Sequence, residues 1–435
     1  MRTSVSEEPV IVIIDRQNIY NIDFDNIDIA EEWNKPLGRE KLIHSIHAYP
    51  AKFPAFITLK AIQKARNQDI EVKNIADIFC GCGTVAYESV CSGCDFWGYD
   101  LNPVATLIAK VKSGRYDVSV IKDFFDKIIT ALEGRELDNS DPSLSNERIR
   151  YWFNEEQIIE LSKLKSSIIE IVHDENYRNF FLCAFSNILK SCSRWLTKSI
   201  KPQVDPEKIP KPPKDAFSYQ IKMMISAFEE SDVNYNGVPH FETVNILERT
   251  FENPFIDLVV TSPPYVTSYE YADLHQLSSL WLGYTDDYRS LRKGSIGSLH
   301  NAHDYDENME QLNFTGKEIV KTLAVKDKSK ARSVSQYYVD MQKVATQVYK
   351  MLHDDGVAVF VIGNTQYKDT HMNNAKHLVE SLINVGFTFI NVDRRKISNK
   401  ILTPYRNEKG KFSKMEKSTK KVYAEEFVIF ARKTQ

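Results

Sequence analysis

A serine, two prolines and a tyrosine follow an apolar stretch, and their types and order suggest specific chemistry. The four residues are Ser262, Pro263, Pro264 and Tyr265, and the apolar stretch before them covers residues 255–260. Proline ends strand pairing and fixes its own φ, so strand termination accounts for the two prolines. It does not account for the hydroxyl on one side and the aromatic ring on the other.

The hydroxyl and one carbonyl of this tetrapeptide are placed to hold an aromatic amine. The lone pair of an exocyclic amine on a nucleic-acid base is delocalised into the ring, which makes its nitrogen a poor nucleophile. The Ser262 hydroxyl and the Pro263 carbonyl, acting as acceptors, can draw that nitrogen towards tetrahedral geometry and aim its lone pair at a methyl donor. Pro264 would hold the carbonyl in place, and Tyr265 would stack on an extruded base. We therefore interpret all four residues as catalytic.

A second motif combines an apolar strand, a glycine loop and a helix. It reads DIFCGCGT, and its candidate cofactor-binding residues are Asp77, Phe79, Gly81, Gly83 and Thr84. Glycines at this position let the backbone approach a ligand closely, while the N–H groups of the following helix face it. The spacing matches neither the GxGxxG dinucleotide pattern nor a phosphate loop that ends in Gly-Lys-Ser/Thr. The alternative for this motif is a plain structural turn.

An acidic residue ends the next predicted strand. Asp100 closes the stretch FWGYD, and Asn102 and Pro103 follow it. A carboxylate at this place can accept hydrogen bonds from both hydroxyls of a ribose. The alternative is a turn or a helix N-cap, because Asp and Asn-Pro are good turn residues. With the glycine loop upstream, we favour the ribose role for Asp100 and include Asn102 in the cofactor site.

Together these motifs resemble a known family. DIFCGCGT, then GYDLNP, then TSPPY after an apolar strand, are similar to the amino-group DNA methyltransferases that use S-adenosylmethionine. Serine at the first position of the tetrapeptide most resembles the N4-cytosine branch, whereas adenine-N6 enzymes more often carry Asp or Asn there. The stretch VFVIGNTQ and the C-terminal RRKISNK and EEFVIFAR are also similar to that family. The resemblance covers about residues 41–113 and 241–433.

The resemblance adds further cofactor residues and shows two departures. HAYPAKFP is similar to the stretch that closes over the methionine end of the cofactor, which implies contacts from Tyr49, Lys52 and Phe53. The family's acidic contact to the adenine ring is replaced by VNILER, so Asn245 or Ile246 would serve there. The cofactor motifs also precede the catalytic tetrapeptide, the reverse of the order in many SPPY enzymes. The same strands joined differently can still build the site.

The activity that this resemblance implies is methyl transfer from S-adenosylmethionine to the exocyclic N4 amine of a flipped cytosine. The implied substrate is double-stranded DNA, methylated at specific sites for restriction-modification or host DNA marking, with a cognate restriction endonuclease as a possible partner. The nearer alternative is the same fold acting on adenine N6 or on RNA. The farther alternative is a non-catalytic nucleic-acid-binding protein that has kept the fold.

The order of predicted elements indicates the fold class. Strand and helix patterns alternate, which predicts a parallel sheet in an α/β fold. The resemblance implies that this is a Rossmann-like class I methyltransferase sheet. Between the two α/β parts, apolar residues recur at helical spacing, and a basic, proline-rich arm follows them. We expect an N-terminal extension (1–40), a cofactor-binding half (41–113), a mostly helical insertion (114–240) and a catalytic half (241–435). The insertion, or the loop at about 285–335, is the candidate target-recognition region.

Bulk composition limits where nucleic acid could bind. The chain has 435 residues, 42% hydrophobic and 26% charged, with a formal net charge of -3. That charge is no global signature of nucleic-acid binding, so binding must come from local patches. Three stretches are basic, at 194–214, 317–332 and 394–421. Each could be an ordinary solvated face, and together they suggest a surface sorted to meet phosphates.

Cysteine and histidine usage argues against a metal site. Four of the six cysteines lie close together in the sequence: Cys80, Cys82, Cys91 and Cys94. Small residues filling a tight cofactor site explain them better than zinc ligation, so we expect no metal. We interpret His44 and His47 as packing or polar contacts.

The N-terminal stretch is a poor signal peptide, and no segment approaches the ~18 apolar residues of a membrane helix. We therefore expect a cytoplasmic protein, prokaryotic or phage-encoded.

Overall fold

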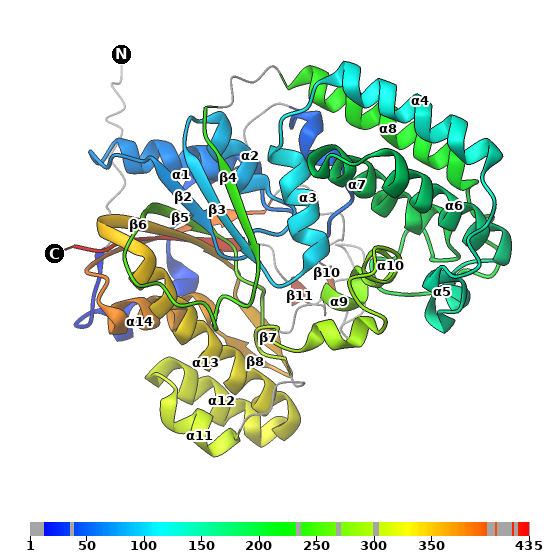
Figure 1. The fold of residues 1–435 in the computed structure, drawn as a ribbon. Helices are drawn as coiled ribbons and strands as arrows, with labels where there is room; N and C mark the ends of the chain where they lie inside the picture. The colour runs from blue at the N-terminus through cyan, green and yellow to red at the C-terminus, as the bar shows by residue number, and fades with distance from the viewer. Residues whose placement is uncertain are drawn as a thin grey trace, which may run out of the picture.

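A central sheet with helices on both faces organises the computed structural model (Figure 1). The structure describes residues 13–34, 39–231, 236–266, 271–298, 304–397, 405–406, 420–421 and 425–434. The strands of the sheet are β1 (Ile13–Ile14), β2 (Asn74–Asp77), β3 (Asp95–Asp100), β4 (Pro239–Thr243), β5 (Ile256–Thr261), β6 (Leu352–Ile362), β9 (Phe389–Lys396) and β12 (Glu425–Arg432).

The strand order is β1-β9-β12-β6-β5-β2-β3-β4. Strands β4, β3, β2, β5 and β6 are parallel, whereas β12 pairs antiparallel with both β6 and β9. This confirms the predicted α/β class. The chain order turns at β2, which has β3 on one side and β5 on the other. Ligands of open α/β sheets bind at such a switch point, beyond the carboxyl ends of the strands.

Side chains of the central strands alternate between two cores. Leu258 and Val260 of β5 face a core shared with α1 (Ala55–Arg66) and α2 (Thr84–Cys91). Val259 faces the opposite core, which α13 (Lys328–Met351) and α14 (Asn374–Val385) cover. This period of two explains why every residue of FIDLVV except Asp257 is apolar: helices bury both faces of the strand.

The predicted helical insertion is present, and its core is continuous with residues of α3 (Pro103–Ser113) and α10 (Gln276–Trp281). Its helices are α4 (Val118–Gly134), α5 (Glu147–Trp152), α6 (Glu155–Ile171), α7 (Glu175–Cys192) and α8 (Pro213–Glu230). They pack against α3, the helix that follows β3, and Figure 1 shows them on one side of the sheet. The prolines of residues 193–212 keep that arm non-helical, and α8 begins within the proline-rich stretch, at Pro213. An isolated bridge joins Trp195 to Val204 within the arm.

The remaining α-helices and strands of the described residues follow the predicted catalytic tetrapeptide. They are α9 (Tyr271–Leu274), α10 (Gln276–Trp281), α11 (Tyr305–Gln311), α12 (Phe314–Lys326) and the antiparallel pairs β7–β8 (Thr365–Tyr367, Thr370–Met372) and β10–β11 (Tyr405–Arg406, Lys420–Lys421). Most of the basic stretch 394–421 lies outside the described residues. In the part of the chain that the structure describes, no helix is both long and apolar enough to cross a membrane.

Candidate active site

The glycine loop after β2 has a backbone that only glycine adopts easily. Gly81 has φ +48° and Gly83 has φ +71°, both in the left-handed region. A Cβ on Gly83 would lie 2.6 Å from the Cα of Ala109 in α3. A Cβ on Gly81 would lie 3.3 Å from Cε1 of Tyr49. The first glycine therefore keeps the ligand-facing surface open beneath Tyr49, and the second lets α2 approach α3.

Asp100 at the end of β3 anchors this loop. Its two carboxylate oxygens accept the backbone N–H groups of Gly81 (2.9 Å) and Asn102 (2.8 Å). Burial raises the pKa of Asp100 to about 6, and the two N–H donors oppose that rise. Each carboxylate oxygen keeps a further lone pair. The side chain can therefore fix the loop and still accept hydroxyl donors from a ligand.

Asp77 at the end of β2 joins the glycine loop to the catalytic loop. Its Oδ1 accepts the Phe79 backbone N–H at 3.0 Å and the Thr261 hydroxyl at 2.6 Å. Burial raises the pKa of this carboxyl to about 7. Thr261 directly precedes Ser262, so one side chain spans two segments that are far apart in the sequence.

The catalytic tetrapeptide begins where β5 ends, at the switch point of the sheet. The Ser262 hydroxyl donates to the Val361 carbonyl of β6 at 3.0 Å. A hydroxyl has one proton and two lone pairs, so this bond uses its only donor. The Ser262 oxygen is left as an acceptor. Pro263 is buried, and Pro264 is partly exposed.

Tyr265 is held by a network that sequence reasoning did not find. Its hydroxyl donates to Oε1 of Glu426 at 2.8 Å, and Nη1 of Arg395 lies 3.1 Å from Oε2 of the same carboxylate. A Cβ on Gly363 would lie 3.1 Å from the tyrosine ring. Burial and the Glu426 carboxylate raise the pKa of Tyr265 well above its ordinary value, so it stays a neutral phenol. Glu426 and Arg395 lie on the antiparallel pair β12 and β9, and only strand register brings them together.

The segment before α1 contributes Tyr49 to the site. The Tyr49 ring stacks on His275, with centroids 5.0 Å apart, and lies beside Gly81. Lys52 points elsewhere: its Nζ lies 2.5 Å from Oε2 of Glu40 and 3.1 Å from the His44 carbonyl. Both acceptors belong to the same part of the chain as Lys52. Of Tyr49 and Lys52, both predicted to contact the cofactor, Tyr49 is the one that lies against the glycine loop.

The other predicted cofactor residues occupy different positions around the switch point. Phe53 packs against the core under α1, and Thr84 is the buried first residue of α2. Asn102 caps α3 by accepting the Val104 N–H, and its Nδ2 is buried without a partner in the described structure. Asn245 follows β4 next to β3, and its Nδ2 donates to Glu248 at 3.1 Å.

The histidines and cysteines make local polar contacts. His44 Nε2 lies 2.8 Å from Glu88 in a buried pair, and His47 Nε2 lies 3.0 Å from the Ser186 hydroxyl of α7. Burial lowers the pKa of His47 to about 4, so this ring is neutral. Lys112 donates to the Cys82 sulfur at 3.3 Å. Among the described residues, no group of three or more potential metal ligands converges.

Comparison with known proteins gives one relative by sequence. No family model matches the chain. The chain is 26% identical over 358 residues to the Type II methyltransferase M.MvaI of Kocuria varians. The aligned region covers 76% of this chain and 78% of that protein.

Solved structures give fold matches with low scores. A SAM-dependent methyltransferase from Methanosarcina mazei matches 89% of this chain and 99% of its own, at 11% identity and a TM-score of 0.28. The rRNA methyltransferase aviRa from Streptomyces viridochromogenes matches 90% and 89%, at 9% identity and a TM-score of 0.28. The strand order, with the glycine loop and the acidic end of β3, defines a Rossmann-like α/β fold.

Proposed function

We propose that the protein is a DNA methyltransferase that transfers a methyl group from S-adenosylmethionine to the exocyclic N4 amine of cytosine. One observation carries the proposal. The Ser262–Tyr265 loop lies at the switch point next to the glycine loop, with the only proton of the Ser262 hydroxyl donated to Val361. A hydroxyl oxygen that can only accept a hydrogen bond at this position is suited to the NH2 group of a target base, which donates one.

The residues around the switch point fit the cofactor. Gly81 leaves space next to Tyr49 that a Cβ would narrow. Asp100 keeps free lone pairs that can accept ribose hydroxyls. The Nδ2 atom of Asn102 is buried and has a hydrogen-bond donor without a partner among the described residues. When bound, S-adenosylmethionine supplies a methyl group on a positively charged sulfur. Tyr49, stacked on His275, would cover the loop and exclude water.

The catalytic loop would orient the amine. The Ser262 oxygen and the Pro263 carbonyl accept its two hydrogens, which turns the nitrogen lone pair towards the methyl donor. The Tyr265 ring stacks on the flipped base, and its hydroxyl is held by Glu426. No strong general base is required, because the amine proton becomes acidic only after the methyl group has been transferred.

The sequence relative supports DNA as the substrate. M.MvaI is described as a Type II methyltransferase, and the match spans most of both chains. By this similarity we propose double-stranded DNA as the substrate and a cognate restriction endonuclease as a partner in the host. The serine at the first position of the tetrapeptide supports cytosine N4 over adenine N6.

Nucleoside analysis tests the proposal. The wild-type chain and Ser262→Ala would be expressed in a host that lacks other DNA methylation, and the digested DNA and RNA analysed by mass spectrometry. We expect N4-methylcytosine in DNA from the wild type only. N6-methyladenine, or a modified base in RNA alone, would contradict the cytosine assignment. If no base is modified and calorimetry detects no S-adenosylmethionine binding, the protein is not a methyltransferase.

A further inference from the structure

Arg148 in α5 has an arginine side chain fixed between aromatic rings. Its guanidinium carbon lies 4.7 Å from the ring centroid of Tyr151, 5.2 Å from that of Trp152 and 5.4 Å from that of Tyr288. Contacts of this kind favour the planar guanidinium over the ammonium of lysine. Two of the rings belong to α5, and the third lies after α10, so the arginine joins the insertion to the catalytic half.

A hydrogen bond sets the orientation of this guanidinium relative to the active site. Arg148 Nε donates to Oε1 of Gln276 at 2.8 Å, and Trp152 Nε1 donates to the same oxygen at 2.9 Å. Gln276 begins α10, and its neighbour His275 stacks on Tyr49 above the glycine loop. Figure 1 shows α5, α9 and α10 grouped beside one end of the sheet. Arg148 is therefore held at the flank of the proposed active site.

The outer edge of the guanidinium has no partner among the described residues. Neither Nη of Arg148 makes a hydrogen bond or an ion pair there, and neither is a buried unpaired atom, so both reach solvent. Neighbouring arginines differ: Arg292 is paired with Asp273 at 2.7 Å, and Arg289 with Asp287 at 2.9 Å. A guanidinium that is fixed in orientation and open along one edge suits an anion with two oxygens, such as a phosphodiester.

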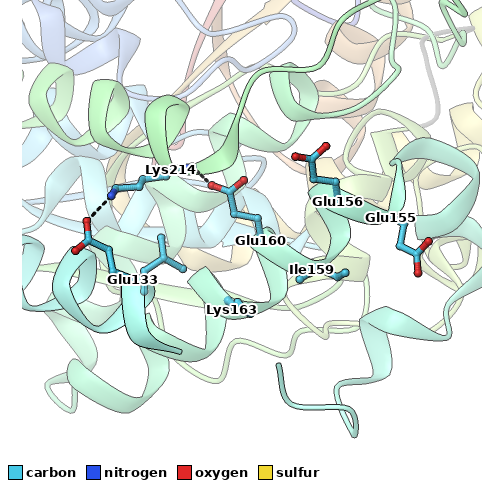
Figure 2. A pocket seen from close by; sticks show the side chains of 8 residues that line it. Glu133, Glu155, Glu156, Ile159, Glu160, Lys163 and Lys214 are labelled. Atoms are coloured by element: carbon cyan, nitrogen blue, oxygen red, sulfur yellow. Dashed lines mark hydrogen bonds and ion pairs between the residues drawn. The ribbon is translucent and has the colours of Figure 1, made fainter. Parts of the chain in front are cut away.

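The outer helices of the insertion have the opposite charge. A cavity of about 560 Å³ between α4, α6 and α8 is lined by four glutamates, Glu133, Glu155, Glu156 and Glu160, and by two lysines, Lys163 and Lys214. Figure 2 shows the Glu133 carboxylate in an ion pair with Lys214 and the Glu160 carboxylate accepting the Lys214 backbone N–H, so the lining keeps an excess of negative charge. Such a surface repels phosphates. A DNA backbone that contacts the insertion would therefore lie along α5 and away from this cavity.

We infer that Arg148 contacts a backbone phosphate of the DNA duplex beside the flipped base. The inference rests on the proposed function and adds the face of the insertion that meets DNA. Since Gln276 and the aromatic rings already restrict the side chain, little conformational entropy would be lost when the phosphate binds. The residue would position DNA and would take no part in methyl transfer.

The test measures how DNA affinity depends on salt. A short fluorescein-labelled duplex of mixed sequence is titrated with the full-length protein and with Arg148→Gln, from about 50 to 200 mM salt, and binding is followed by anisotropy. Loss of one phosphate contact should weaken binding about tenfold at the lowest salt. It should also make the slope of log K against log salt shallower by about one. Arg148→Lys keeps the charge but loses the planar edge, so we expect most of the slope to remain and part of the affinity to be lost.

A matched control separates this role from packing. Arg135 belongs to the same insertion but pairs with Glu170, so Arg135→Gln should leave affinity and slope unchanged. Thermal unfolding and S-adenosylhomocysteine binding are measured for every variant. An unchanged slope in Arg148→Gln, or a loss of DNA affinity accompanied by an equal loss of cofactor affinity, would overturn the inference. A wild-type protein that binds no duplex and methylates no DNA would instead contradict the proposed function.

Discussion

Two carboxylates at the ends of neighbouring strands have different surroundings: Asp77 is buried and Asp100 is partly exposed. Oδ1 of Asp77 accepts both the Phe79 N–H and the Thr261 hydroxyl. Among the described residues, Asp100 accepts two backbone N–H groups, one on each oxygen, and it is the last residue of β3. Burial raises the pKa of both, to about 7 and about 6. We therefore assign the structural role to the first and ligand contact to the second.

The pKa of Asp100 gives a prediction for cofactor affinity. Ribose hydroxyls donate to the ionised carboxylate, so binding should favour the deprotonated form. Because the free carboxyl has a raised pKa of about 6, affinity should be constant above that pH and fall as pH drops below it, approaching tenfold per pH unit. Calorimetry with S-adenosylhomocysteine between about pH 5 and 8 measures this dependence.

Asp100→Asn serves as the control for this pH dependence. Its affinity should be lower than that of the wild type, and its profile should be flatter across the same range. A wild-type profile that is already flat would show that the Asp100 carboxylate does not bind the ribose.

The Ser262 hydroxyl should matter for turnover and not for cofactor binding. In Ser262→Ala the amine loses one of its two acceptors, and we expect turnover to fall about 10²-fold, the scale seen when one preorganised polar contact is removed. S-adenosylhomocysteine affinity should be unchanged, because the hydroxyl bonds only to Val361 among the described residues. Incorporation of labelled methyl groups into DNA and calorimetry measure the two quantities.

Ser218→Ala is the matched control for this substitution. The Ser218 hydroxyl in α8 also donates to a backbone carbonyl, that of Lys214, at 2.8 Å. Its loss should leave turnover unchanged. If cofactor affinity collapses together with turnover in Ser262→Ala, the assigned role of the serine is incorrect.

At the scale of elements, the close approach of α2 to α3 determines the shape of the cofactor loop. This approach depends on Gly83, where a Cβ would overlap the backbone of Ala109. Gly93 at the end of α2 also has a positive φ, +80°, but a Cβ there would meet nothing within 4 Å. Substitutions at these two glycines therefore distinguish the cost of backbone strain from the cost of steric overlap.

We expect Gly83→Ala to destabilise the protein by about 3 kcal/mol, since left-handed strain and an overpacked contact add. Gly93→Ala should cost about 1 kcal/mol from strain alone. Urea unfolding followed by circular dichroism measures both free energies. Equal costs would mean that α2 and α3 can move apart without penalty.

Local sequence patterns predicted some elements well and could not predict others. Strand β3 contains the stretch FWGYD whose end was predicted at Asp100, because its aromatic residues and the turn residues that follow it agree. The segment after the predicted catalytic loop forms two short helices, α9 and α10, with a break at His275, whose side chain stacks on Tyr49. That partner lies in a distant segment, so no local pattern could indicate the break.

The basic stretches show the same limit for charge. Lys208 belongs to the stretch 194–214, yet its Nζ donates to the carbonyls of Lys190 and Trp195 at 2.7 Å. Burial also lowers the pKa of Lys208 to about 8. This lysine stabilises the proline-rich arm. A count of basic residues cannot distinguish such a lysine from one that faces solvent. Arg148 lies outside the counted stretches, yet one edge of its guanidinium has no partner among the described residues.

At the scale of the whole molecule, the insertion holds the segment that covers the glycine loop. Gln220 of α8 donates to the Ile46 carbonyl at 2.7 Å, and Asn187 of α7 accepts the Ala48 N–H at 2.9 Å. Asn187 and Gln220 are also bonded to each other, at 2.7 Å. Tyr49 follows directly, so helices far from the sheet fix a residue of the cofactor site.

Gln220→Ala should therefore weaken cofactor binding from a distance. The Ile46 carbonyl and the Asn187 amide both lose a buried partner, and we expect S-adenosylhomocysteine affinity to fall about tenfold. Asn176→Ala, at the far end of α7, removes a comparable bond to the Arg115 carbonyl and should leave affinity unchanged. Equal affinity in both variants would show that the insertion does not hold this segment.

The hydrogen bond between Thr261 and Asp77 couples two binding equilibria. One carboxylate restrains both the loop proposed for S-adenosylmethionine and the loop proposed for the target base. A ligand that stiffens one loop lowers the ordering cost for a ligand at the other. Thermodynamic reciprocity then requires that DNA tighten cofactor binding by the same factor by which the cofactor tightens DNA binding. Two segments separated by the rest of the cofactor-binding half and by the insertion would thus behave as one cooperative unit.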